Sequence, residues 1–212
     1  MTRRPLSVLR IPTLPAAPGK SGFHIKGVVY SGIFGRLAQE TGALERLREE
    51  LNDQTLLGFF DQLFLASGWY DIFPIVPLFS AMARTRGVSF ESASIEGTRA
   101  RATEDLNSIY RSFYRGATPA QVALRLARGF GRYIDFGDAT STENADGTVE
   151  IATHKLPTFL LPWYMPSAAT FCRIALELAG ARDVRTFWRA PEDDGERGDI
   201  SLASIQLSLS WR

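Results

Sequence analysis

The spacing of apolar residues predicts that the first two thirds of the chain is mainly helical. Apolar side chains recur every three or four positions over Val28–Glu40 and over the shorter amphipathic segment Ala43–Leu51. Gln54–Leu65 is apolar on most sides, which fits either a buried helix or a packed irregular segment. The same spacing predicts helices over Ile75–Arg84, if its prolines lie in the first turn, and over Phe90–Tyr114.

The segment from Pro119 to Ile134 has the clearest helical pattern. Thr118 and Gln121 have the spacing of a capping box, and Pro119 fits the first helical position. Apolar residues then recur at intervals of three and four. We therefore expect a helix here with one apolar face.

After Gly137 the pattern becomes that of a sheet crossed by one helix. The expected elements are a polar, turn-rich loop over Asp138–Gly147, a strand over Thr148–His154, a proline-rich aromatic loop over Pro157–Met165, a helix over Ser167–Leu178, and strands over Val184–Ala190 and Ile200–Trp211 joined by the acidic turn PEDDGERGD. The last strand alternates apolar and polar residues, but Ile200 and Leu202 are in the opposite phase. This change of phase predicts a bulge or turn near Ala203–Ser204.

Helices first and an antiparallel sheet afterwards define an α+β domain. We expect an N-terminal helical layer of about five to six helices, packed on a C-terminal antiparallel sheet of three or four strands crossed by one helix. A single α+β domain is expected over residues 23–212. It would follow a flexible arm at residues 1–22, which is rich in proline, carries four basic residues and has no acidic residue.

Composition narrows the function classes. The 212 residues are 45% hydrophobic and 22% charged, and a net charge of +1 argues against a general nucleic-acid binder. One cysteine and two histidines exclude a disulfide framework and leave little material for a metal centre, so no metal site is expected. No stretch reaches the roughly 18 apolar residues of a membrane span. We therefore expect a cytoplasmic protein.

Four stretches of the sequence resemble a known family. They are KGVVYSGIFGRLAQETG (Lys26–Gly42), SGWYDIFPIVPLFSAMA around Trp69 and Tyr70, SFESASIEGTRARATEDL, and the closing helix–strand–strand unit that ends in SLSWR. In these the chain resembles an uncharacterised paralogous family of myxobacterial proteins, over nearly all of residues 23–212. That family is distantly similar to the haem–nitric-oxide sensor and four-vinyl-reductase domains. The resemblance implies an apolar pocket between helices and sheet, and thus a ligand-binding or partner-binding module.

The resemblance does not extend to haem ligation. Haem sensors of this fold use a proximal histidine on a helix and a Tyr-x-Ser-x-Arg triplet that holds the propionates. Here Tyr110, Ser112 and Arg115 have one residue too many between serine and arginine, and neither His24 nor His154 lies in a predicted helix. We therefore expect no cofactor, haem included.

Candidate ligand-binding residues lie along the expected walls of the pocket, which are the helices at residues 28–40 and 119–134, the segment around Trp69 and the loop around Trp163. Ordinary core packing explains most of these aromatic residues, but explains less well the pair Trp163–Tyr164, which lies between prolines. The candidates are Tyr30, Phe34, Trp69, Tyr70, Phe130, Tyr133, His154, Trp163 and Tyr164.

Three functions remain open. The first is a non-enzymatic, sensor-type module that binds a small hydrophobic ligand. The second is a protein-interaction or scaffold module with a filled core, as a homodimer or with another protein. The third is an enzyme that uses Cys172 as nucleophile and His154 as base, although a free cysteine in an apolar helix is more typical of a core residue.

Overall fold

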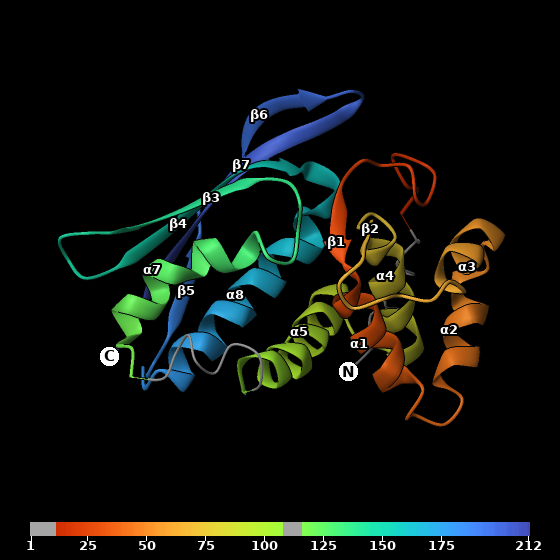
Figure 1. Cartoon of the computed structure of the whole chain (residues 1–212), viewed down its shortest axis with the longest axis horizontal. Helices are drawn as coiled ribbons and strands as arrows, with labels where there is room; N and C mark the ends of the chain where they lie inside the picture. Colours follow the sequence, from red (N-terminus) through yellow and green to blue (C-terminus); the bar gives the residue numbers. More distant parts are fainter. Residues whose placement is uncertain (1–11, 108–115) are drawn as a thin grey trace, which may run out of the picture.

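The computed structural model describes residues 12–107 and 116–212. Its helices come first along the chain and its main sheet last, which confirms the α+β class (Figure 1). The helices are α1 (Gly27–Leu37), α2 (Ala43–Leu51), α3 (Gln54–Phe60), α4 (Ile75–Arg86), α5 (Phe90–Asn107), α7 (Pro119–Phe130) and α8 (Leu161–Leu178), with a 3-10 turn at Thr158–Leu160. The rest of the helix expected up to Tyr114 falls outside the described residues.

Helices α1 to α4 and a two-stranded sheet form one part of the molecule. Strand β1 (His24–Lys26) pairs antiparallel with β2 (Trp69–Asp71). The apolar segment Gln54–Leu65 was expected to be either a buried helix or a packed irregular segment. It forms the short helix α3 and then irregular chain, so each alternative holds over part of its length. The proline before α4 occupies its N-cap, and the second proline lies in its first turn, as expected.

The buried carboxylate of Asp71 fixes the segment before β1. It accepts hydrogen bonds from the backbone of Gly19 at 2.8 Å, from the Ser21 hydroxyl at 2.6 Å and from the backbone of Phe73 at 2.9 Å. The Asp71 carbonyl in turn accepts from the buried Tyr30 hydroxyl at 2.8 Å. The segment before β1 is thus tied to the helical part through one side chain.

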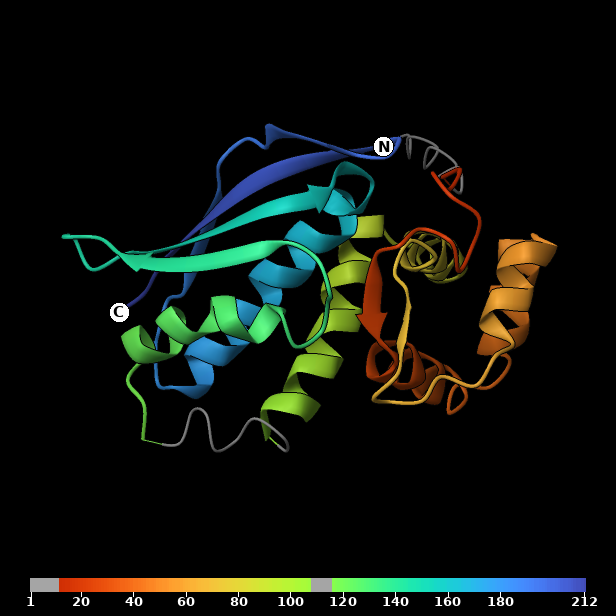
Figure 2. The same cartoon turned by 45° about the horizontal axis from the view of Figure 1, so that its top comes forward.

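The main sheet is antiparallel and has five strands. These are β3 (Asp138–Glu143), β4 (Val149–Pro157), β5 (Arg185–Trp188), β6 (Glu192–Arg197) and β7 (Ile200–Ser210). The strand order is β3-β4-β7-β5, and β6 pairs with the first part of β7 while β5 pairs with its last part. Helices α7 and α8 lie on one face of the sheet, and α5 lies between α8 and the N-terminal helices (Figure 2).

Two segments that were expected to be loops form strands. The segment expected as a polar loop contains β3, and the expected acidic turn contains β6. Both strands are largely exposed at an edge of the sheet, so neither buries a side of its own. Without a buried face there is no apolar alternation, and the polar residues of both segments are therefore typical of turns.

The expected aromatic loop over Pro157–Met165 is also corrected. Helix α8 begins at Leu161, with Pro162 in its first turn, and continues through Pro166. A proline in the first turn leaves no hydrogen bond unmade, because the N–H groups there have no helical partner. Trp163 and Tyr164 therefore lie on a helix rather than in a loop.

The irregularity expected near Ala203–Ser204 of the last strand, β7, lies on the neighbouring strand β4 instead. Thr153 of β4 pairs with Ile205 of β7, whereas Leu156 pairs with Ala203, so β4 contains one extra residue. Lys155 in this bulge has a φ of 56°. A second irregularity lies opposite the same part of β7, on β6, where Asp193 pairs with Ala203 and Glu196 with Ser201.

Buried side chains form two clusters that meet at α8. One fills the N-terminal helices and reaches Leu156 and Ile205 of the sheet, and the other lies between α7, α8 and the sheet and contains Cys172. Phe130 packs against both clusters. In the parts of the chain described here, no helix is long and apolar enough to cross a membrane.

Candidate functional site

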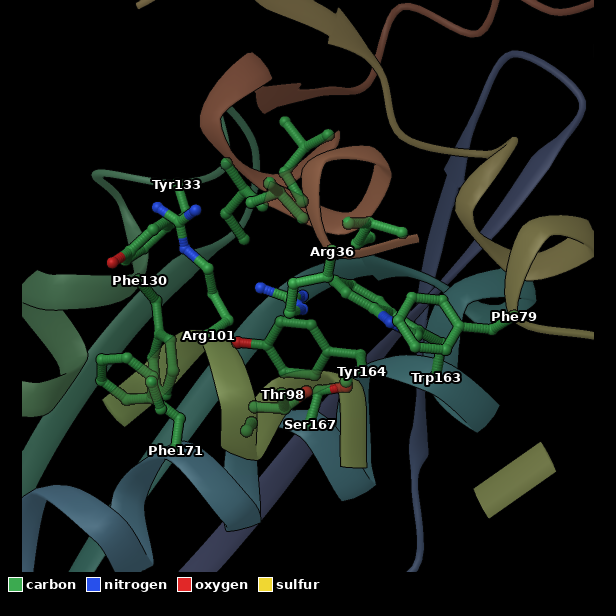
Figure 3. A pocket seen from close by; sticks show the side chains of 17 residues that line it. Arg36, Phe79, Thr98, Arg101, Phe130, Tyr133, Trp163, Tyr164, Ser167 and Phe171 are labelled. Atoms are coloured by element: carbon green, nitrogen blue, oxygen red, sulfur yellow. The ribbon is translucent and has the colours of Figure 1, made fainter. Parts of the chain in front are cut away.

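A cavity of about 120 Å³ lies where the helical part meets the sheet part (Figure 3). Its walls come from β1, α1, α4, α5, the end of α7 and α8. The lining residues are Ile25, Val29, Ile33, Arg36, Phe79, Gly97, Thr98, Arg101, Ala102, Phe130, Tyr133, Ile134, Trp163, Tyr164, Ser167, Ala168 and Phe171. Because the two parts of the fold enclose it from opposite sides, its size depends on how they are spaced.

Gly97 lets α5 approach the aromatic wall of the cavity. A Cβ atom at this position would lie 2.7 Å from the ring of Phe79. Phe79 in turn lies 6.3 Å from the Trp163 ring, centroid to centroid. Any residue larger than glycine would push the Phe79 ring from its place.

Three buried polar groups on α8 have no hydrogen-bond partner among the described residues. They are the indole N–H of Trp163, the hydroxyl of Tyr164 and the hydroxyl of Ser167. The three side chains are 8%, 5% and 8% exposed and all line the cavity. Leaving a buried polar group unpaired costs about 1–3 kcal/mol, so native proteins seldom leave several together. These three groups can therefore accept a partner in the cavity, either ordered water or a ligand.

The Tyr164 hydroxyl is a neutral donor. Burial raises its pKa well above the ordinary range, because the charged phenolate would be poorly solvated there. The neighbouring Thr153 side chain partly offsets this rise in the pKa, but no contact between the two meets hydrogen-bond geometry. The proton therefore stays on the hydroxyl and is available to an acceptor.

The charges of the lining are all positive. Arg36 and Arg101 contribute guanidinium groups, and the described lining includes no aspartate or glutamate. Arg101 donates to the carbonyl of Val28 at 2.8 Å, and Arg36 lies 3.7 Å from the exposed carboxylate of Glu104. In the view of Figure 3 Arg36 lies beside the Tyr164 ring, with Ser167 on the other side of the ring, whereas Arg101 extends toward Tyr133.

Four of the residues predicted from the sequence come together in this cavity. Phe130 enters from the end of α7, Tyr133 from the segment after α7, and Trp163 and Tyr164 from α8. The Phe130 and Tyr164 rings lie 6.1 Å apart. Sequence analysis missed Arg36, Arg101 and Ser167, because polar residues on predicted helices are most simply interpreted as solvated.

The other predicted residues lie elsewhere. Tyr30, Phe34 and Tyr70 surround Phe64 in a separate aromatic cluster of the helical part. Trp69 is 43% exposed, with the Lys26 ammonium 3.9 Å above its ring.

His154 and Cys172, considered as a catalytic pair, are in different surroundings. His154 is half-exposed on β4, where its Nδ1 lies 3.6 Å from Asp194. Cys172 is fully buried beneath the sheet, and burial raises the pKa of its thiol. A thiol with a raised pKa forms little thiolate at neutral pH. Tyr110, Ser112 and Arg115, which were compared with the propionate-binding triplet, lie outside the described residues.

Comparison with solved structures finds proteins similar to this chain, whereas comparison of sequences does not. No family model matches the chain, and no curated protein matches it. The H-NOX protein from K. algicida in its Fe(II) unliganded form is 9% identical, with a TM-score of 0.65 over 89% of this chain and 97% of that chain. The S. oneidensis H-NOX protein in the Fe(II)NO state is 7% identical, with a TM-score of 0.61 over 89% and 99%. A point mutant of T. tengcongensis H-NOX is 10% identical, with a TM-score of 0.59 over 88% and 98%.

At these identities the likeness shows the fold alone: the chain has the fold of H-NOX domains. This confirms the distant similarity to the haem–nitric-oxide sensor fold, whereas the resemblance to the myxobacterial family stays a prediction.

The expectation of no cofactor is overturned. One of the similar structures is described as modulating haem redox potential through porphyrin distortion. Another is described as probing the function of haem distortion in the H-NOX family. The expectation relied on the lack of one ligation pattern, which does not decide what this fold can hold.

Proposed function

We propose that this chain is a ligand-binding module of the sensor type, with its ligand in the cavity between α1, α5 and α8. The observation that supports the proposal is the group of three buried polar side chains of α8 that line the cavity and have no hydrogen-bond partner among the described residues. The fold adds support, because the similar solved structures are described as H-NOX proteins with Fe(II) or Fe(II)NO.

The volume sets the size of ligand that enters without rearrangement. An apolar cavity of about 150 Å³ binds benzene in another protein, whereas drug-sized ligands need about 300–1,000 Å³. At about 120 Å³, this cavity is smaller than that benzene site, so one ring or a short aliphatic chain is the upper limit of a ligand that enters without rearrangement. A larger ligand requires the helical part and the sheet part to separate.

Haem is such a larger ligand, and the lining fits it in part. Arg36 and Arg101 could pair with carboxylates, and the oxygens of Tyr133 and Tyr164 are of a type that ligates haem iron in some proteins. Neither histidine lines the cavity, so ligation through an imidazole does not fit the described residues. Haem therefore enters the proposal as a candidate whose absorbance makes it directly testable.

A set of contacts beside the cavity, between β1 and the segment after α7, supports the sensor-type role. The backbone N–H of Lys26 donates to the carbonyl of Tyr133 at 2.7 Å, and that of Asp135 donates to the carbonyl of His24 at 3.2 Å. The His24 ring also lies 2.6 Å from the Asp135 carboxylate. These contacts join β1 to the segment after α7, and Tyr133 lines the cavity. A ligand that changes the spacing at the cavity would act on this junction.

The test combines mass spectrometry, absorbance and two added ligands. Native and denaturing mass spectra of the purified protein show whether a small molecule leaves on unfolding. The ligand-free protein is then titrated with toluene and with haemin, beside the variant Ala168→Leu, which fills the cavity from α8.

We expect a released mass, saturable toluene binding or a Soret band in the wild-type protein, and its loss in Ala168→Leu. Absence of all three in a folded wild-type protein, or equal binding by the variant, would overturn the proposal.

A further inference from the structure

We infer that the ligand of this cavity is a carboxylate with a small apolar body. The inference rests on the proposed function and specifies the chemical class of the ligand. It follows from the charge of the lining, the nature of its hydrogen-bonding groups and the shape of the apolar walls.

The charge of the lining selects an anion. Arg36 and Arg101 are positive, and no carboxylate belongs to the described lining, although the exposed carboxylate of Glu104 lies 3.7 Å from Arg36 outside it. Charges interact more strongly in a site that is shielded from water, so a bound anion gains and a bound cation is repelled. A neutral ligand would gain little from the positive charge of these two arginines.

All of the hydrogen-bonding groups can donate, and only the two hydroxyls can also accept. The Trp163 indole N–H and a guanidinium can only donate, and the hydroxyls of Tyr164 and Ser167 are unpaired among the described residues. A guanidinium has five N–H groups, so Arg101 can hold the Val28 carbonyl and a ligand at the same time. A carboxylate accepts about four hydrogen bonds and forms stronger ones with charged donors. One such group could therefore satisfy several of these donors together.

The remaining walls are apolar and aromatic. Val29 and Ile33 of α1 face Phe171 and Ala168 of α8 across the cavity. With about 120 Å³ available, the body of the ligand is limited to one ring or an alkyl chain of similar size. Benzoate has these properties and serves as the probe.

Calorimetric titration with benzoate and with nitrobenzene tests the inference on the unaltered protein. Nitrobenzene has nearly the same shape but no net charge. We expect benzoate to bind at least about tenfold more tightly, since charge-assisted hydrogen bonds are about twice as strong as neutral ones. The preference should fall several-fold in Arg36→Gln. It should be unchanged in Arg48→Gln, which removes an exposed arginine of α2 that pairs with Asp61.

The outcomes separate this inference from the proposed function. If nitrobenzene or toluene binds as tightly as benzoate, the cavity takes ligands but the carboxylate inference is wrong. If benzoate binds equally well to Ala168→Leu, it occupies another place and the inference is overturned. If none of the three probes binds, and no mass or Soret band accompanies the protein, the proposed function fails as well.

Discussion

Replacing Ser167 with alanine is expected to make the ligand-free protein more stable. The Ser167 hydroxyl is buried on α8 and has no hydrogen-bond partner among the described residues, so the folded state bears its desolvation cost. That cost is about 1–3 kcal/mol for a buried polar group. Alanine removes it with little change in volume and adds up to about 0.7 kcal/mol of helix propensity. The free energy of unfolding should therefore rise by about 1–3 kcal/mol, and each kcal/mol corresponds to about 2–4 °C in Tm for a chain of this length.

Two other serines provide matched controls. Ser94 of α5 and Ser80 of α4 are equally buried and helical, but their hydroxyls donate to backbone carbonyls at 2.9 Å. Their alanine variants gain the same helix propensity and lose a hydrogen bond, so they should be neutral or destabilised by about 1 kcal/mol. Urea denaturation of the ligand-free proteins measures the three values. If Ser167→Ala changes stability no differently from Ser94→Ala, the hydroxyl is already satisfied and the reasoning about α8 is refuted.

Three further predictions concern groups outside the cavity. Burial raises the pKa of the Cys172 thiol, so a disulfide reagent at about pH 8 should modify the urea-unfolded protein within minutes and leave the native protein intact. Rapid native labelling would contradict this. The buried Asp71 accepts four hydrogen bonds, so Asp71→Ala should lower the free energy of unfolding by about 3 kcal/mol or more, against about 1 kcal/mol for the exposed helix cap in Asp53→Ala. Equal losses in urea titrations would show that the Asp71 contacts add little. Lys155 lowers the pKa of Asp194, so this pair stabilises the fold above the ordinary pKa of the carboxyl and ceases to do so as the pH falls through the lowered value. Asp194→Asn should therefore reduce Tm near neutral pH and reduce it less as the pH falls through the lowered pKa, and a difference that stays the same in acid would count against the pairing.

The helices that bury one face could be predicted from the spacing of their apolar residues. Helix α7 shows this best, since its capping box forms as expected, with Thr118 and Gln121 exchanging bonds of 3.0 and 3.3 Å. Strands β3 and β6 could not be predicted in this way. They lie at sheet edges with mostly exposed side chains, and their pairing is decided by β4 and β7 rather than by their own sequences.

The aromatic residues of the candidate site could be proposed from the sequence, whereas its arginines and Ser167 could not. Bulky residues such as Trp163 and Tyr164 need partners wherever they lie, so proposing them as pocket residues required no knowledge of the fold. Arg36 and Arg101 are on two different helices, and only the packing of α1 against α5 turns both toward one cavity. Ser167 differs from Ser94 only in what surrounds its hydroxyl. Such a difference belongs to the tertiary structure.

The most direct test of the ligand site follows the indole N–H of Trp163 in two-dimensional proton–nitrogen spectra. Comparison with Trp163→Phe assigns its resonance among the four tryptophans of the chain. Benzoate and toluene are then titrated separately. We predict that at least one of them shifts the Trp163 resonance in a saturable way, while the half-exposed Trp69 does not respond. If the Trp163 resonance stays in place with both ligands, the cavity beside α8 is not a ligand site.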